Sequence, residues 1–292
     1  MSYTNSILFK VQIIAQVAII LIFFSFNFGA NLQAVVCGIL LCLIGIPHGA
    51  NDHLYRKDKT VIGMLKFLSV YLGTMSLYII LWYLIPILAL ILFFLVSFHH
   101  FGQSNFENDK VWYSPSILWG IILIVFPVII HFEEAILIFK SMVGLGDFNQ
   151  LIFDSNFTWP NIWQSISLIL ISVIYLFALL KYQKQHFISY FLQFLLVSIW
   201  YFITPLLFGF IVVFCLWHSM QSINHQLTFF TSNFKKKKEN FFIACLPFSL
   251  TSLLGFAAYL YFFSFNIGTS FILLSLITLP HVLVMHKLYE SK

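Results

Sequence analysis

The chain is built from apolar runs, each about as long as a helix must be to cross a bilayer. A spanning helix takes roughly 20 consecutive, mostly apolar residues. Ten such runs follow one another: 7–26, 31–50, 62–82, 84–103, 116–132, 162–180, 187–203, 205–226, 241–263 and 268–287. Since lipid offers the backbone no hydrogen-bond partners, each run is expected to form a helix that satisfies its own polar groups.

The composition favours a membrane domain over a soluble one. Hydrophobic residues make up 61% of the chain and charged residues only 9%, whereas soluble domains contain roughly 25% charged residues. A water-soluble fold would have too few polar side chains to cover its surface. We therefore predict one all-α, polytopic membrane helix bundle over residues 1–292, with about ten (eight to ten) transmembrane helices.

Basic residues predict the orientation of the bundle. If the runs cross alternately, Lys140 is alone on its side, and the other fourteen of the fifteen basic residues fall on the opposite side. Basic residues mark the cytoplasmic side, so both termini are expected there, with the chain in the cell (cytoplasmic) membrane. Segment 133–160 is then an extracytoplasmic loop with an interfacial helix at Ala135–Val143, and 229–240 is a basic cytoplasmic loop. The net charge of +5 suits anionic lipid headgroups, and no nucleic-acid partner is expected.

Histidines gather at one level of the predicted bundle. Eight of the ten lie at the cytoplasmic ends of four runs: His48, His53, His99, His100, His218, His225, His281 and His286. Imidazole at membrane depth is costly unless it is paired or coordinated, and neutral imidazole is the commonest metal ligand. Three or four clustered histidines would hold iron, zinc or copper. The sequence therefore predicts a metal site near the cytoplasmic side.

Helical spacing predicts which of these side chains share a face. Residues three, four or seven apart lie on one face, whereas neighbours diverge by about 100°. His99 and His100 are therefore not both expected to reach one centre, while Asp52 lies on the face of His48. The eighth run carries one polar stripe: His218, Gln221, Ser222 and His225.

Four short motifs resemble those of one enzyme family. Residues 45–52, Gly-Ile-Pro-His-Gly-Ala-Asn-Asp, resemble the G-x-P-H-G-A-x-D signature of the Brp/Blh-type bacterial β-carotene 15,15′-dioxygenases. Residues 97–102 resemble that family's H-F-G motif, 217–219 the start of its H-S-x-x-H motif, and 279–281 its late P-H pair. The motifs occur in the family order and cover nearly the whole chain.

The resemblance implies an all-helical membrane enzyme that uses non-haem Fe²⁺ and O2. Such an enzyme cleaves the central 15,15′ double bond of β-carotene or a related carotenoid into two all-trans-retinal molecules, which a microbial rhodopsin can take up. The resemblance places iron ligands and catalytic roles on His48, His100 and His218. The second histidine of H-S-x-x-H corresponds to Ser222. His225, one turn further along, is therefore expected to be the fourth ligand, with His281 as the alternative.

Other residues are expected to support such a centre. Asp52 would orient a ligand imidazole, or complete a set of two histidines and one carboxylate. Gln221 and Ser222 are expected to lie beside the ligands. The 36 Phe, 13 Tyr and 7 Trp residues could line an apolar aromatic tunnel through which a carotenoid enters from the lipid bilayer.

Two other functions fit part of the pattern. A di-iron membrane desaturase or hydroxylase also places histidines at cytoplasmic helix ends, but the sequence contains neither the HxxxH nor the HxxHH cluster of that class. A transporter or metal permease with a histidine-lined site would distribute polar groups through the depth of the bilayer. The eight histidines are instead predicted to lie at one depth, which favours a fixed site over a translocation path.

Overall fold

The computed structural model of the chain is helical in the parts that it describes. The backbone is described for residues 4, 6–26, 28–56, 58, 60–106, 113–146, 159–234, 238–262 and 266–290. The side chains of 233, 234 and 286–290 are outside that description, and so is the side chain of His286 named above. Among the described residues there is no strand, which agrees with the predicted all-α class.

The described helices confirm the expected number of spans. Nine are long and apolar enough to cross a membrane: Ile7–Ser25, Ala30–Tyr55, Val61–Leu84, Pro86–Phe106, Ile162–Tyr182, Lys184–Ile203, Leu206–Ser232, Lys238–Phe262 and Ile267–Met285. A bent pair, Ser114–Ile130 followed by Phe132–Met142 at 106°, makes up to ten. The orientation of the termini stays a prediction.

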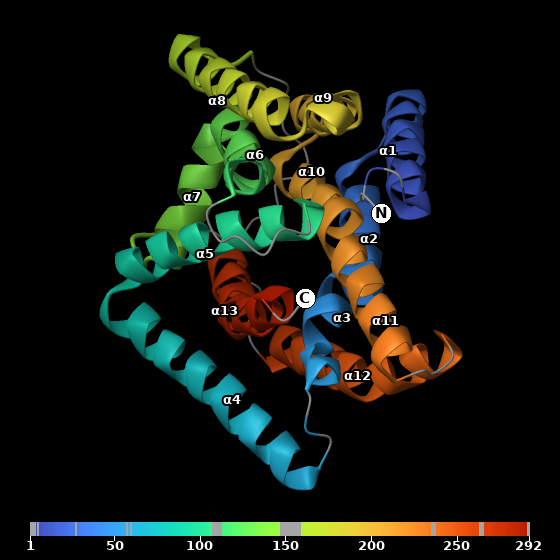
Figure 1. The fold of residues 1–292 in the computed structure, drawn as a ribbon. Helices are drawn as coiled ribbons and strands as arrows, with labels where there is room; N and C mark the ends of the chain where they lie inside the picture. Colours follow the sequence, from blue (N-terminus) through green and yellow to red (C-terminus); the bar gives the residue numbers. More distant parts are fainter. Residues whose placement is uncertain are drawn as a thin grey trace. The chain divides into compact units, whose positions relative to one another are not determined.

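Contacts divide the chain into two compact units, each assembled from separate stretches of sequence. Unit 1 comprises Met1–Leu40, Phe98–Ile136 and Leu151–Gln221, and unit 2 comprises Leu41–Ser97, Leu137–Gln150 and Ser222–Lys292. The expectation of one domain therefore stays a prediction. The helices of unit 1 are α1 (Ile7–Ser25), α2 (Ala30–Leu40), α6 (Ser114–Ile130), α8 (Ile162–Tyr182), α9 (Phe187–Ile203) and α10 (Leu206–Val213) (Figure 1). Those of unit 2 are α3 (Ile46–Ala50), α4 (Val61–Leu84), α12 (Lys238–Phe262) and α13 (Ile267–Glu290), while α5 (Pro86–Phe106), α7 (Phe132–Met142) and α11 (Met220–Phe234) give residues to both.

Local sequence determines where several helices begin. The Thr60 hydroxyl accepts a hydrogen bond from the Gly63 N–H at the start of α4, at 3.1 Å. At the start of α8, Asn161 and Gln164 each accept from the other's backbone N–H. Each such cap contributes about 1 kcal/mol to helix stability.

Two glycines bring the backbones of α5 and α6 together inside unit 1. A Cβ atom added to Gly102 would overlap the backbone of Ser116, and one added to Gly120 would overlap the backbone of Phe98. Only a residue without a side chain allows this approach. The contact fixes the last turns of α5, which carry His100.

Helix α1 is tied to the π-helical segment Phe214–Ser219, which links α10 to α11 in unit 1. The Gln12 amide donates to the Leu216 carbonyl at 2.5 Å, and the Trp217 indole donates to Gln16 Oε1 at 3.1 Å. Both glutamines are fully buried. A π-helical turn widens the ring of backbone hydrogen bonds, and here a side chain bonds one of its carbonyls.

In unit 2, α12 packs on α3 and α13 packs on α4. The Trp82 indole of α4 donates to the Ser275 hydroxyl of α13 at 3.0 Å, and the Asn51 amide donates to Ser249 of α12 at 3.2 Å. The first bond joins α4 to α13, and the second joins the segment that follows α3 to α12.

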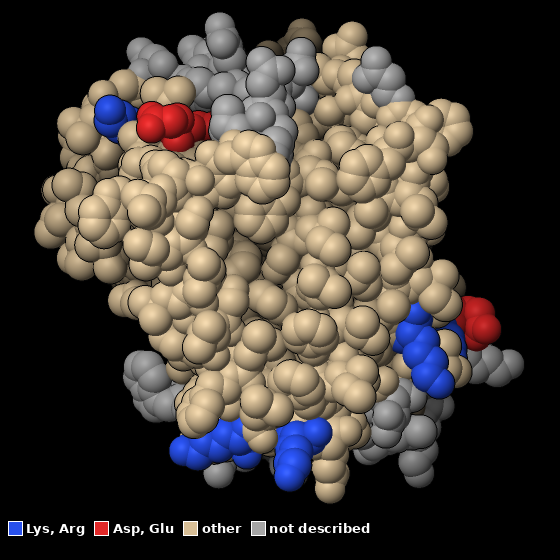
Figure 2. All heavy atoms as spheres, turned by 90° about the horizontal axis from the view of Figure 1, so that it is seen from above, with Lys and Arg blue, Asp and Glu red and all other residues tan. Residues whose placement is uncertain are grey.

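Large apolar side chains remain exposed on the long helices of both units. Tyr83 of α4 is 86% exposed, Ile7 of α1 81% and Ile188 of α9 72%. Few of the surface side chains in Figure 2 are charged. In water each exposed large apolar side chain would forgo about 1.5–3 kcal/mol of burial. Lipid as the surrounding solvent explains the pattern.

The predicted segment boundaries differ from the structure at two places. The helix expected at Ala135–Val143 begins earlier, at Phe132. Helix α11 continues to Phe234, so the eighth span extends beyond the predicted end at 226, and α12 begins at Lys238. Residues 227–234 mix apolar and polar side chains, so the hydropathy of the run falls before the helix ends. Residues 147–158 and 235–237 of the two predicted loops lie outside the described residues.

Candidate metal centre

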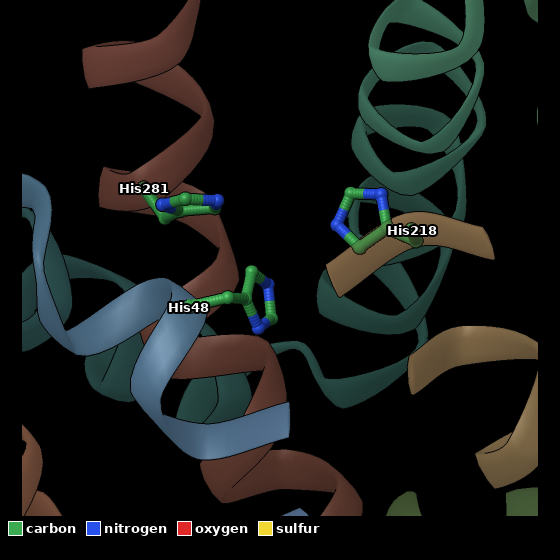
Figure 3. Close-up of side chains that lie close together, drawn as sticks. All are labelled: His48, His218 and His281. Atoms are coloured by element: carbon green, nitrogen blue, oxygen red, sulfur yellow. The ribbon is translucent and has the colours of Figure 1, made fainter. Parts of the chain in front are cut away.

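Two histidines from distant stretches of the chain meet inside unit 2. His48 on α3 and His281 on α13 have ring centroids 5.3 Å apart, with the rings nearly perpendicular at 88° (Figure 3). They are 6% and 2% exposed. A buried imidazole pair at membrane depth needs hydrogen bonds or a metal to offset its desolvation.

The backbone around His48 fixes the direction of its ring. A π-helical segment, Leu41–Gly45, ends one turn before it, and Pro47 stands in the first turn of α3. The His48 Nδ1 atom bonds the carbonyl of Gly45. On the other side, the Gln226 amide donates to the backbone carbonyl of His48 at 2.7 Å. The residue is therefore held at both its ring and its backbone.

The ring of His281 is fixed by a carboxylate. Its Nδ1 atom lies 2.6 Å from Oδ1 of Asp52, which is also buried. The second carboxylate oxygen, Oδ2, accepts a hydrogen bond from the Tyr71 hydroxyl at 3.1 Å. Asp52 therefore bonds the imidazole of His281; that it orients a metal ligand stays a prediction.

Unit 1 holds a second pair, His100 on α5 and His218 in the π-helical segment Phe214–Ser219. Their ring centroids are 4.6 Å apart, and they are 2% and 1% exposed. The His218 Nδ1 atom lies 3.2 Å from the Ser104 hydroxyl, which itself donates to the Phe101 carbonyl at 3.0 Å. Because the hydroxyl proton is directed to Phe101, the Ser104 oxygen accepts from His218.

Aromatic side chains shield the His218 ring. Phe101 stacks on it at 4.3 Å between centroids and 12° between planes, and Phe214 lies 5.6 Å away at 28°. Flat apolar contacts of this kind keep water from the imidazole faces and restrict rotation of the ring.

The three bonded histidines share one pattern, in which Nδ1 faces an acceptor. The acceptors are a carbonyl for His48, a hydroxyl for His218 and a carboxylate for His281. We assign the proton to Nδ1 in each ring on this basis, which makes Nε2 the nitrogen that would coordinate. Buried imidazoles that present Nε2 in this way suit a transition metal. His48 and His281 in unit 2 and His218 in unit 1 are therefore buried candidate ligands for a metal ion.

Two of the other predicted residues, Gln221 and His225, form hydrogen bonds away from the histidine pairs. The Gln221 amide donates to Asn105 at 3.0 Å, and Asn105 exchanges two bonds with Gln193. His225 contacts Tyr55, with 3.3 Å between Nδ1 and the hydroxyl. Ser222 is fully buried. All four residues of the predicted stripe are buried, as a shared helix face requires, and His218, Gln221 and His225 each bond a different partner.

Sequence reasoning missed several of the supporting residues. Ser104 lies one turn after His100, so its spacing could have indicated a shared face. Asn105 and Gln193 are buried amides. Their position in or beside apolar runs could also have indicated a supporting role. Tyr71 gave no such signal, because the chain has 13 tyrosines and most serve other purposes. His99 is only half-buried beside the buried His100, as the divergence of neighbours predicts.

Spanning helices and buried histidines with fixed tautomers define a polytopic membrane protein equipped to bind a metal ion. The family model described as Beta-carotene 15,15'-dioxygenase matches residues 39–289 of this chain. The chain belongs to that family. The matched stretch includes all four sequence motifs, and the resemblance inferred from them is confirmed.

A curated relative supports the same conclusion. The chain is 25% identical over 272 residues to the Beta-carotene 15,15'-dioxygenase of uncultured marine bacterium 66A03, in an alignment that covers 86% of this chain and 92% of the relative. No solved structure matches the chain.

Proposed function

We propose that this protein cleaves the central double bond of β-carotene, or of a closely related carotenoid, with O2 at a histidine-bound Fe²⁺, giving two molecules of retinal. The observation that carries the proposal is that Nδ1 of His48, of His218 and of His281 each bonds an acceptor, which leaves the Nε2 atom of each ring to coordinate. Membership of the family supports the substrate and the reaction.

We assign the iron to four ligands, His48, His100, His218 and His281. His100 is included because its ring lies beside that of His218 and because the family motif falls on it. His281 takes the place of the missing family histidine at Ser222. It is preferred to His225 because its ring lies beside that of His48 and its Nδ1 bonds a carboxylate, whereas His225 faces a tyrosine.

The proposed reaction balances without a further reductant. The 15,15′ carbon–carbon double bond and the O–O bond break, and two carbon–oxygen double bonds form, so that each aldehyde receives one oxygen atom. The carotenoid is oxidised and O2 is reduced. Bound iron would supply the redox chemistry that lets O2 react with an alkene.

The protein's own part is to orient the ligands and to exclude water. The acceptors at Nδ1 keep each Nε2 basic and correctly turned. Phe101 and Phe214, stacked on His218, would keep water away and offer flat apolar contacts to a polyene. We place the centre near the cytoplasmic side of the cell membrane, with an aromatic path by which the carotenoid enters from the bilayer.

The test is metal content and product formation in one preparation. We expect the purified chain in detergent to hold about one Fe²⁺ and to form retinal from β-carotene in air. Chelation should abolish turnover, Fe²⁺ should restore it, and Zn²⁺ should not, because zinc has no redox chemistry. His48→Ala, His100→Ala and His218→Ala should each abolish turnover, with the half-buried His186→Ala as the control. Turnover at the wild-type rate in the chelated chain would overturn the proposal.

A further inference from the structure

The carboxylate of Asp52 is anchored at both of its oxygens, and the second anchor comes from a helix without a candidate ligand. Oδ1 bonds His281 at 2.6 Å, and Oδ2 accepts from the Tyr71 hydroxyl of α4 at 3.1 Å. Tyr71 is half-buried, while its neighbours Val70 and Leu72 are 67% and 55% exposed. Tyr71 therefore lies on the half-buried face of α4, together with Phe67 and Thr74.

An aspartate side chain needs such a second bond to keep its plane. The terminal torsion of Asp is broad, so one hydrogen bond leaves the carboxylate able to swing. Two bonds on different oxygens, from His281 and Tyr71, restrict it to one orientation. In a setting of low dielectric, hydrogen bonds to a charged acceptor are strong and strengthen one another.

We propose that Tyr71 is a positioning residue for the metal centre. By holding Asp52, it fixes the plane of the His281 ring and so the direction of its coordinating nitrogen. This inference rests on the proposed function, in that it takes His281 as a ligand. Outer hydrogen-bond partners of this kind change metal affinity by about 10- to 100-fold.

Tyr71 does not hold α4 in place alone. The indole of Trp82, three turns further along α4, bonds Ser275 of α13, and it is buried. Loss of one hydroxyl at Tyr71 should therefore leave α4 attached to α13, and the effect should concentrate on Asp52 and His281. This separates a positioning role from a packing role.

The experiment compares Tyr71→Phe with Tyr83→Phe, the same substitution on the same helix at a side chain that is 86% exposed. The full chain, freed of metal in detergent, is titrated with Co²⁺, and the visible absorption of the bound ion is recorded. We expect Tyr71→Phe to weaken Co²⁺ binding about 10-fold or more and to alter the spectrum. Loss of this donor to a buried carboxylate should also lower the thermal midpoint below that of the Tyr83→Phe control, so the Co²⁺ affinity and the spectrum are the readouts that test the positioning role.

The His281→Ala variant distinguishes the two ways in which this inference can fail. If Tyr71→Phe matches Tyr83→Phe in affinity and spectrum while His281→Ala differs from both, the positioning role is wrong and the metal centre stands. If the wild-type chain binds neither Co²⁺ nor Fe²⁺, the proposed centre itself is wrong. A Tyr71→Phe chain with unchanged affinity and spectrum but a lowered midpoint would assign Tyr71 to packing and also overturn the inference.

Discussion

Nδ1 of His281 lies 2.6 Å from Oδ1 of Asp52, although the two residues are 229 positions apart in the sequence. Both are 2% exposed, so this short contact replaces water at Nδ1 of His281 and at Oδ1 of Asp52. A carboxylate that accepts from a histidine makes the opposite ring nitrogen a better ligand. Asp52, which belongs to the first sequence motif, thus bonds His281. We assign His281 as the fourth ligand because Ser222 stands where the family motif has a histidine.

Asp52→Asn is expected to weaken iron binding about 10-fold or more. The amide has the shape of the carboxylate but lacks the negative charge that strengthens the bond to His281. Its NH2 group would also face the Tyr71 hydroxyl, which donates to Asp52 in the wild-type chain. Competition with a coloured chelator measures the affinity. Asp58→Asn, at an exposed aspartate before α4, is the control. Equal affinities in the two variants would remove Asp52 from this role.

Ser222→His is expected to rescue a chain that lacks His281. Position 222 is four residues after His218 and so shares its helix face. His281→Ala should lower the iron bound per chain, and the double variant His281→Ala with Ser222→His should recover most of it. Metal analysis of the purified protein measures the iron bound per chain in the single and the double variant. His225→Ala is the control and should bind as much iron as the wild-type chain. A double variant as poor in iron as His281→Ala alone would contradict the assignment.

Gly102→Ala is expected to disrupt unit 1. Its new methyl group would overlap the backbone of Ser116, which cannot move aside as a flexible side chain would. We expect a loss of several kcal/mol in stability, seen as poor yield and a much lower thermal midpoint, as overpacking in a close contact produces. Gly73→Ala in α4 meets nothing within 4 Å and should be neutral or slightly stabilising. Similar midpoints for the two variants would refute the close contact of α5 with α6.

Gln12→Leu is expected to destabilise the attachment of α1. The substitution removes the donor to the Leu216 carbonyl and leaves that buried group without it, at a cost of about 1–3 kcal/mol. The thermal midpoint in detergent should fall. Ser25→Ala, which removes an exposed hydroxyl from the same helix, should leave it unchanged. If the two variants unfold at the same temperature, the buried bond contributes little.

Reporter fusions test the predicted orientation of the chain. A fluorescent protein that matures only in the cytoplasm should be bright when it is fused to the C-terminus or inserted among Lys235–Lys238. Alkaline phosphatase, which is active only outside, should report from an insertion near Lys140. The physical reason is the bias of basic residues towards one side. The reverse pattern of signals would show that the orientation is inverted.

The sequence predicted the spans well because the length of an apolar run is a direct consequence of bilayer thickness. It also singled out His48, His100 and His218, since polar residues in apolar runs are conspicuous and motifs fix their register. It favoured His225 over His281 as the fourth ligand, because His225 lies one turn along the helix from Ser222. That choice depends on which helix packs on which, and the contact of Asp52 with His281 joins opposite ends of the chain. No residue pattern marked the two π-helical segments, because a widened turn uses ordinary apolar residues.

Those two π-helical segments have a consequence for how such a centre arises. A π-helical turn accommodates one residue more than an α-helical turn, and each residue turns the helix by about 100°. One of the segments, Leu41–Gly45, ends three residues before His48, and the other, Phe214–Ser219, contains His218. A single inserted residue is therefore enough to re-aim a ligand while the ends of its helix and the adjoining loops stay where they were. The insertion of one codon can therefore move a histidine to another face of its helix while the surrounding bundle is unchanged.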